Sequence, residues 1–191
     1  MPSETRARMV AGAARLLAER GLQETSFSEV LELTGAPRGS IYHHFPGGKD
    51  QLVGSAVDLA GANAIALIDR SAGKPAHEVA TDFIGLWREV LVRSQYRVGC
   101  SVLAVTIATD SDDLLEHAST VFRTWRARLA ELLTEGGLKP ADAARFAAIL
   151  IAGTEGAVVL SRAEKSMEPF ELVAEQLSSQ AIDLAARGAH G

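Results

Sequence analysis

Residues 35–45, with the sequence GAPRGSIYHHF, decide how the first part of this chain folds. Gly35 is a strong signal for the end of a helix, because glycine adopts the left-handed backbone conformation that follows a last helical turn. Pro37 then favours a new helix start, and Pro46 with two glycines ends that helix after Phe45. Ile41 and Phe45 are four residues apart and are expected to face inward. The stretch therefore predicts a short helix that follows a tight glycine turn.

The residues before this stretch predict two more helices. Ser26 to Glu29 fit the S-x-x-E capping box, which opens a short helix that ends at Gly35. Further upstream, one apolar stripe with spacings of three and four runs from Arg6 to Arg20 and consists of Val10, Ala13, Ala14 and Leu17. One long helix followed by two short ones is the outline of a three-helix helix-turn-helix domain.

The side chains of the third helix suit contact with DNA. Arg38 can reach guanine or a phosphate, and the small residues Gly39 and Ser40 let the backbone approach the duplex closely. Tyr42 lies about one turn further on and can share their exposed face. An alternative for Tyr42 is a half-buried aromatic ring with a solvated hydroxyl.

A second group of residues can contact phosphates. His43 and His44 offer hydrogen bonds, and Lys49 stands near a helix start, where free backbone N–H groups also favour an anion. Thr25 and Ser26 combine hydroxyls with the start of the second helix. Two alternatives stay open: Lys49 can be merely solvated, and the histidines can form a zinc pair. Adjacent helical residues point in different directions, however, and no ligand-spaced partner is visible.

Composition excludes several classes of protein. The chain has 191 residues, 47% of them hydrophobic, which is too apolar for a disordered protein. The polar start MPSETRARMV lacks the apolar region of a signal peptide, and a single cysteine forms no internal disulfide. The longest apolar stretch, near residues 143–160, is interrupted by Arg145, Thr154 and Glu155 and is expected to be too polar and too short to span a bilayer. We therefore expect a cytoplasmic protein.

The net charge of −5 is unevenly distributed along the chain. Residues 1–50 carry six basic and six acidic side chains, so the whole excess of acid lies in residues 51–191. Residues 36–49 contain no acid at all. An acidic protein can thus present a basic surface to DNA.

Residues 6–53 resemble the DNA-binding domain of the TetR family of bacterial repressors. The matching stretch runs from AxxLLAERGLxxTSF to GAPRGSIYHHFPGGKDQL. The resemblance implies recognition-helix contacts by Arg38, Gly39, Ser40 and Tyr42, and phosphate contacts by Thr25, Ser26, His43, His44 and Lys49. Many members have Ser or Thr where Pro37 stands, so a cap is expected to be missing here, and the turn before Lys49 is one residue longer than the common pattern.

Further helices are predicted at about 49–70, 75–94, 100–109, 111–136, 140–164 and 168–187, which gives an all-α chain of about nine helices. The family resemblance implies a DNA-binding domain over 1–50 and an effector-binding and dimerisation domain over 51–191. The pairs Gly47-Gly48, Gly99-Cys100 and Glu155-Gly156 are similar to the LmrA/YxaF-like branch of drug-responsive regulators.

If the larger domain binds an effector, its aromatic and neighbouring residues are the candidates to line a mainly apolar pocket. These are Phe83, Trp87, Tyr96, Cys100, Leu103, Ile107, Phe122, Trp125, Phe146 and Glu155. The alternative is that each is an ordinary core residue, and Cys100 is most simply a small buried hydrophobe. Glu155 places a carboxylate in a strongly apolar helix. This carboxylate must be paired, protonated, or exposed to a cavity or interface.

The last two predicted helices are the candidate dimer interface. The first offers small residues for close helix approach, and the second supplies apolar bulk. The small residues are Ala144, Ala147, Ala148, Ile151, Gly153, Gly156 and Ala157. The bulkier ones are Phe170, Leu172, Val173, Leu177, Ile182 and Leu184. The alternative is that both helices pack only within one subunit.

The sequence thus predicts a homodimeric, ligand-responsive repressor with no enzymatic activity, cofactor or metal. It is expected to bind a pseudo-palindromic double-stranded operator and to leave it when a small, largely apolar molecule binds. Two alternatives remain: a DNA-binding regulator that responds to a protein or to no ligand, and an all-α binding module or enzyme whose helix-turn-helix part is only structural.

Overall fold

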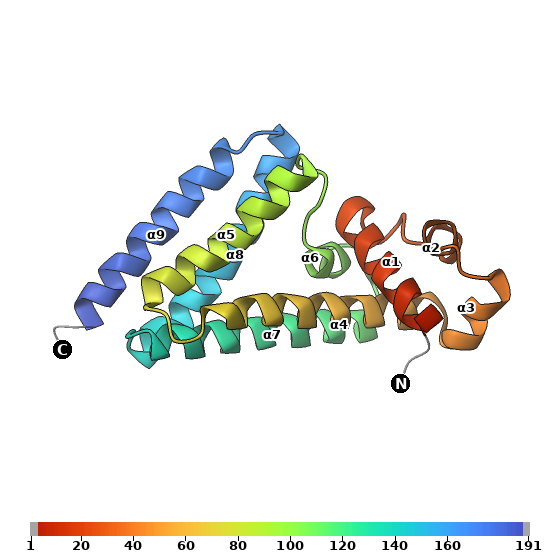
Figure 1. Cartoon of the computed structure of the whole chain (residues 1–191), viewed down its shortest axis with the longest axis horizontal. Coiled ribbons are helices and arrows are strands. Elements are labelled where there is room, and N and C mark those ends of the chain that lie inside the picture. The colour runs from red at the N-terminus through yellow and green to blue at the C-terminus, as the bar shows by residue number, and fades with distance from the viewer. Residues whose placement is uncertain (1–3, 189–191) are drawn as a thin grey trace. The chain divides into compact units, whose positions relative to one another are not determined.

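The computed structural model describes residues 4–188, and it confirms the all-α prediction for them (Figure 1). One 3₁₀ helix, η1, accompanies the α-helices. Their bounds are α1 Glu4–Arg20, α2 Phe27–Thr34, α3 Arg38–His44, α4 Gly48–Ile68, η1 Asp69–Ser71, α5 Ala76–Ser94, α6 Ser101–Thr106, α7 Asp112–Glu135, α8 Pro140–Glu164 and α9 Glu168–Gly188.

The chain divides into two compact units. The first holds the chain up to Asn63 together with Cys100–Phe122, and the second holds Ala64–Gly99 and the chain from Arg123 onward. The boundaries at residues 63 and 122 therefore fall inside α4 and α7. This division describes packing, and the functional boundary at residue 50 stays a prediction.

In the first unit, α1 packs against α2 and α6, and α2 packs against α3. Gly12 on α1 allows a close approach to α2, because a Cβ there would lie only 2.5 Å from Cγ2 of Thr34. Fully buried side chains from successive helices form the core of this unit: Met9, Leu16, Leu17, Val30, Ile41, Phe45 and Leu52. Burial of this apolar surface is what holds the short helices α2 and α3 in place, since helices of so few residues are not stable alone.

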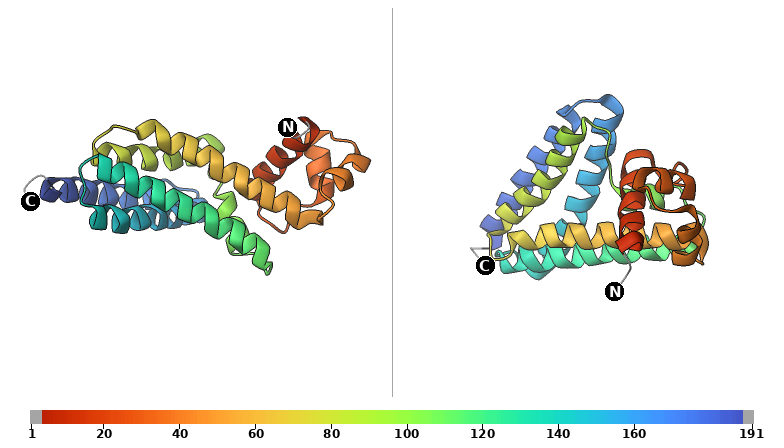
Figure 2. Two further views of the ribbon diagram at one scale, coloured as in Figure 1. Left: turned by 90° about the horizontal axis from the view of Figure 1, so that it is seen from below. Right: turned by 45° about the vertical axis from the view of Figure 1, so that its right-hand side comes forward.

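In the second unit, α5, α8 and α9 lie side by side, as the further views of Figure 2 also show. Arg88 on α5 makes a bidentate ion pair with Glu171 on α9, with two N–O distances of 2.8 Å. The core of this unit is filled by large buried side chains: Ile84, Leu91, Leu129, Phe146, Leu150, Phe170 and Leu177.

The packing of α8 on α9 corrects part of the expected dimer face. Ala147, Ile151 and Ala157 are buried within the subunit. A Cβ at Gly153 would lie 3.3 Å from Cδ1 of Leu177 on α9, so this small-residue face is already covered by the same chain. Phe170 and Leu177 are buried as well and are core residues of the subunit.

Within residues 4–188, two helical runs are long and apolar enough to cross a membrane by length and composition, namely Gly48–Ser71 and Pro140–Glu164. This corrects the expectation that the stretch near 143–160 is too short and too polar, because the helix extends to 25 residues and its charges are few. Half of the apolar window of α8 is buried inside the protein, as is 39% of that of the first run. Core packing therefore accounts for much of this apolar character.

Candidate nucleic-acid interface and ligand-binding residues

The turn between α2 and α3 forms as the sequence predicts. The Ser26 hydroxyl caps α2 by accepting a hydrogen bond from the backbone N–H of Glu29 at 3.2 Å. Gly35 ends α2 in the left-handed conformation, with φ of 65°, and its N–H donates to the Leu31 carbonyl. A residue with a Cβ is strained in this conformation, which explains why glycine stands here.

The helix α3 has one buried face and one exposed face. Ile41 and Phe45, the C-cap residue of this helix, are fully buried, whereas Tyr42 is 70% exposed. The Tyr42 ring meets the Phe27 ring edge-on, with 5.6 Å between the ring centroids. The packing thus fixes the orientation of α3 and leaves Tyr42 on its outer face.

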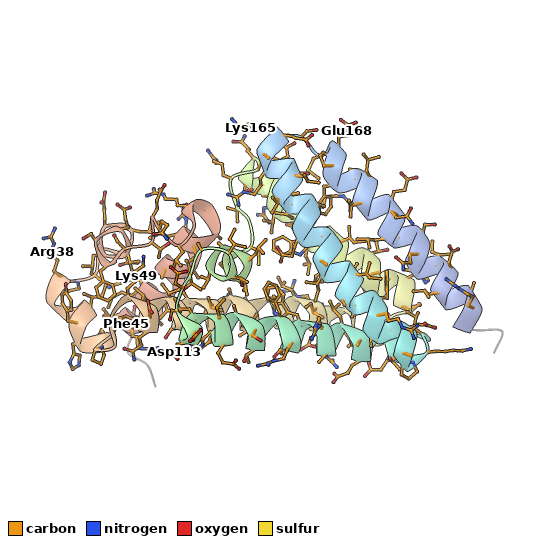
Figure 3. The ribbon with its side chains drawn as sticks, turned by 180° about the vertical axis from the view of Figure 1, so that it is seen from behind. Arg38, Phe45, Lys49, Asp113, Lys165 and Glu168 are labelled. Atoms are coloured by element: carbon orange, nitrogen blue, oxygen red, sulfur yellow. The ribbon has the colours of Figure 1, made fainter. Side chains whose placement is uncertain are left out.

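The N-terminal end of α3 is open to an incoming molecule. Arg38 is exposed, makes no ion pair with the residues that the structure describes, and points away from the neighbouring helices (Figure 3). A Cβ on Gly39 would have no atom within 4 Å. Pro37 provides no side-chain cap, as expected, and the Ser40 hydroxyl donates to its carbonyl at 2.6 Å. Backbone and guanidinium groups are therefore accessible at this end.

The predicted phosphate contacts differ in exposure. His43 is exposed, His44 and Ser26 are half-buried, and the Lys49 ammonium donates to the Leu22 carbonyl at 3.0 Å. Lys49 thus links the start of α4 to the turn after α1, and two of its three N–H donors remain available for a phosphate.

Thr25 differs from the other predicted phosphate contacts. Its side chain is 1% exposed, and its hydroxyl donates to the Gly21 carbonyl at 2.8 Å. This side chain stabilises the turn between α1 and α2 and presents no exposed donor, so a direct phosphate contact by Thr25 has no support in this structure.

The ten predicted ligand-binding residues are shared between the two units. Cys100, Leu103, Ile107 and Phe122 belong to the first unit, and the other six belong to the second. Ile107 is 76% exposed, which is unlike a pocket residue. Phe83, Cys100, Trp125, Phe146 and Glu155 are buried, and Trp87, Tyr96, Leu103 and Phe122 are half-buried.

Local hydrogen bonds account for some of these positions. The Cys100 sulfur accepts a hydrogen bond from the Leu103 N–H at 3.4 Å and so caps α6. Beside Glu155 on α8, the buried Thr154 hydroxyl donates to the carbonyls of Leu150 and Ile151. Cys100 therefore stabilises the N-terminal end of this short helix.

A cavity of about 480 Å³ lies in the second unit, and Phe83 is the one predicted ligand-binding residue that lines it. Its polar rim includes Arg70, Lys74 and Asp82, which sequence reasoning missed. The sequence predicts an interruption between the helices at about 49–70 and 75–94, but an interruption between helices does not indicate a cavity. Among residues 4–188, no group of His, Cys, Asp or Glu side chains is arranged to hold a metal ion.

Comparison with known proteins follows this division of the chain. Residues 9–56 match the family model described as bacterial regulatory proteins, tetR family. Residues 76–176 match the model of the C-terminal domain of LmrA/YxaF-like transcriptional regulators, which covers more than half of the chain. The chain belongs to the TetR family of transcriptional regulators.

Relatives match this TetR-family chain over most of their length. It is 37% identical over 179 residues to an uncharacterized HTH-type transcriptional regulator of Mycobacterium tuberculosis, covering 90% of this chain and 91% of that protein. It is 26% identical over 176 residues to the HTH-type transcriptional regulator LmrA of Bacillus subtilis, covering 87% of this chain and 91% of LmrA. The predicted LmrA/YxaF-like branch is confirmed, and the members of this family are transcriptional regulators and not enzymes, as predicted.

Solved structures support the fold. A regulatory protein TetR from Rhodobacter sphaeroides superimposes with a TM-score of 0.83 at 22% identity, over 93% of this chain and 98% of that chain. The reduced form of Escherichia coli NemR gives a TM-score of 0.75 at 20% identity, over 91% and 95% of the two chains. These structures show the fold, and the family match over residues 9–56 identifies the helix-turn-helix as the DNA-binding element of a transcription regulator.

Proposed function

We propose that this chain represses transcription as a homodimer that binds a pseudo-palindromic operator and leaves it when a small molecule binds. The observation that carries the proposal is the split character of α3. Its inner face is anchored by the fully buried Ile41 and the C-cap residue Phe45. Tyr42 and Arg38, which has no ion pair with any residue that the structure describes, stand on an outer face without acidic residues. A rigid helix with an exposed, cationic N-terminal end is what major-groove recognition requires.

The DNA-binding role belongs to residues 1–50. Arg38, Gly39, Ser40 and Tyr42 contact base edges or nearby phosphates, and Ser26, His43, His44 and Lys49 contact the backbone on either side. Thr25 contributes by shaping the turn that presents α2. Phosphate contacts supply much of the affinity and make it dependent on salt.

The dimer forms through the outer faces of α8 and α9. Five large apolar side chains on these helices are 45–63% exposed in the single subunit: Ile149, Val159, Leu160, Leu172 and Ile182. On α8 they are spaced with the exposed Gly156 on one helical face, and a Cβ at Gly156 would have no atom within 4 Å. Two copies of α8 and α9 would bury this surface in a four-helix bundle, with half-sites about one helical turn apart or a multiple of it.

Release from DNA follows from preferential binding of the effector by residues 51–191. The effector shifts the protein toward its free form by no more than its difference in affinity for the two forms, so a preference of about 100-fold supplies about 2.7 kcal/mol. The continuity of α4 from Gly48 to Ile68 supports this coupling, because one helix contributes to both units. The protein acts in the cytoplasm, where its operator is.

The experiment is a fluorescence anisotropy titration of the purified chain with labelled DNA from upstream of its own gene. We expect affinity above that for a scrambled duplex, with a linear fall of log K against log salt. Equal binding of both duplexes would refute the repressor function.

A second measurement tests the dimer. Gly156→Glu adds a charge where the subunit has free space, so the fold should persist while light scattering shows a monomer. Ala62→Glu, which adds the same charge at an exposed position on α4 outside α8 and α9, is the control. A Gly156→Glu protein that stays dimeric would exclude this face.

A further inference from the structure

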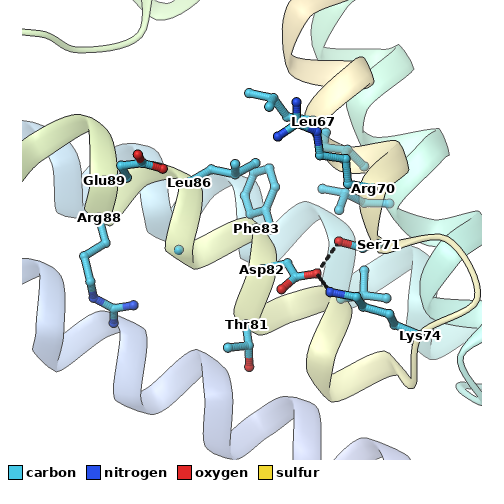
Figure 4. A pocket seen from close by; sticks show the side chains of 14 residues that line it. Leu67, Arg70, Ser71, Lys74, Thr81, Asp82, Phe83, Leu86, Arg88 and Glu89 are labelled. Atoms are coloured by element: carbon cyan, nitrogen blue, oxygen red, sulfur yellow. Dashed lines mark hydrogen bonds and ion pairs between the residues drawn. The ribbon is translucent and has the colours of Figure 1, made fainter. Parts of the chain in front are cut away.

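The cavity in the second unit has an apolar floor and a charged rim. It lies among the end of α4, η1, α5 and α7 and has a volume of about 480 Å³, within the usual range for small-molecule sites. Phe83 and Leu86 project from α5 toward the side on which Leu67 and Arg70 lie (Figure 4). The apolar side chains that line it are Leu67, Ile68, Val79, Phe83, Leu86 and Leu129.

One side of the rim is closed by a hydrogen-bonded charge pair. The Lys74 ammonium donates to the Asp82 carboxylate at 2.6 Å, and the Ser71 hydroxyl donates to the same oxygen at 2.7 Å. The hydrogen bond to Asp82 raises the pKa of Lys74. Desolvation acts to raise the pKa of Asp82, but the hydrogen bonds from Lys74 and Ser71 outweigh it, and the net shift is downward. Both groups are therefore charged at neutral pH and balance each other.

The other charges of the rim are also balanced, with one exception. Arg88 is paired with Glu171, and Glu89 is paired with Arg93 at 2.6 Å. Arg70 is exposed and has no ion pair with any residue that the structure describes. The rim of the cavity thus carries one uncompensated charge, and it is positive.

We propose that this cavity binds a small amphipathic anion. The anionic group, a carboxylate or a sulfonate, lies against the Arg70 guanidinium, which has the planar donors to bind it. The apolar body, an aromatic ring system or a short aliphatic chain, lies on Phe83 and Leu86. This inference rests on the proposed function only in making such an anion the effector; the binding itself does not depend on DNA.

The proposal discriminates between ligands that share a shape and differ in charge. The probes are 2-naphthoate, the neutral 2-naphthylmethanol and the cationic 2-naphthylmethylammonium, each titrated into the purified chain by calorimetry. We expect 2-naphthoate to bind about ten-fold or more tightly than the neutral probe, because a charge-assisted hydrogen bond is worth about 1.5–3 kcal/mol. The cation should bind most weakly.

Three variants locate the site. Arg70→Gln should weaken 2-naphthoate binding by about ten-fold and remove its advantage over the neutral probe. Gly85→Leu should abolish binding of both, because Gly85 lines the cavity and a Cβ there meets no atom within 4 Å. Arg126→Gln removes an exposed arginine of α7 that lies outside the cavity and should leave binding unchanged. Circular dichroism verifies that each variant is folded.

The results also separate this inference from the proposed function. Equal binding of the neutral and anionic probes, or unchanged 2-naphthoate binding by folded Arg70→Gln, would overturn the inference. If wild-type protein binds 2-naphthoate as expected but shows no operator preference, the repressor function fails and the site stands. If it prefers its operator but 2-naphthoate does not bind, the site fails and the repressor function stands.

Discussion

Replacing Tyr42 with alanine should separate DNA recognition from folding. The side chain is 70% exposed, and its aromatic contact is the edge-on pairing with Phe27. Such a pair stabilises the fold by about 0.5–1.5 kcal/mol, and the higher helix propensity of alanine offsets about a few tenths of a kcal/mol of its loss. We therefore expect Tyr42→Ala to lower the free energy of unfolding by about 1 kcal/mol or less.

The expected effect on operator binding is larger than the effect on stability. Loss of one good base-edge contact costs about 1–3 kcal/mol, which corresponds to roughly 5- to 150-fold in affinity for each half-site. A symmetric dimer loses the contact at both half-sites. Tyr42→Phe keeps the ring and removes the hydroxyl, so its loss should be limited to about 0.5–1.5 kcal/mol, the net value of one hydrogen bond.

Both quantities can be measured on the same samples, affinity by fluorescence anisotropy and stability by urea unfolding. Leu33→Ala is the matched control, because Leu33 is an exposed apolar residue of α2 in the same unit. It should leave operator affinity within about twofold. Full operator affinity in folded Tyr42→Ala would refute the assignment of α3 as the recognition helix. A loss of helical signal that parallels the loss of binding would show that the residue is structural.

Three other changes test the charge and core assignments. Arg38→Gln should reduce the slope of log K against log salt by about 0.9 per protomer if Arg38 neutralises a phosphate, whereas an unchanged slope with lost preference at one base pair would place it on guanine. The hydrogen bond from Arg88 outweighs desolvation and lowers the pKa of Glu171, so the ion pair stabilises the fold above the ordinary glutamate pKa of about 4.3 and loses its effect as pH falls through the lowered value. Urea unfolding at pH 7 should show that Glu171→Gln lowers the free energy of unfolding by less than about 1 kcal/mol, because both partners are well exposed. The two proteins should be equally stable in strong acid. A difference in stability that persists in strong acid would contradict this account. Phe146→Ala should cost about 3–5 kcal/mol through the cavity it leaves at a fully buried site, visible as a lower urea midpoint at constant m, and a cost below 1 kcal/mol would mean that Phe146 does not hold the core.

The helices of the DNA-binding part could be predicted because their signals are local. The cap at Ser26, the left-handed Gly35 and the split between Ile41 and Tyr42 each depend on residues within about one helical turn, and the structure has all three. The predicted end of α6 was less accurate, since the helix stops at Thr106 and not near residue 109. Few local signals mark that end.

The ligand-binding residues could not be predicted in the same way. Periodicity shows which side of a helix is apolar, but the cavity depends on which helices meet and how completely their side chains fill the space between them. Arg70, Lys74 and Asp82 come from η1, the loop after it and α5, and no sequence pattern joins them. The same limit applies to Thr25, because only the fold shows that its hydroxyl is used by the Gly21 carbonyl.

The helix α8 shows why composition alone left two interpretations open. Alanine and glycine occur on both of its faces, so the sequence could not say which small residues pack within the subunit. In the structure, Leu177 covers the face that contains Gly153, while the face that contains Gly156 remains open beside the exposed Val159 and Leu160. A surface of this kind is too apolar to be a preferred water-facing surface. Because the chain belongs to a family of DNA-binding regulators, the second copy of α8 and α9 that we propose accounts for both the hydropathy of this helix and its uncovered glycine better than a lipid bilayer does.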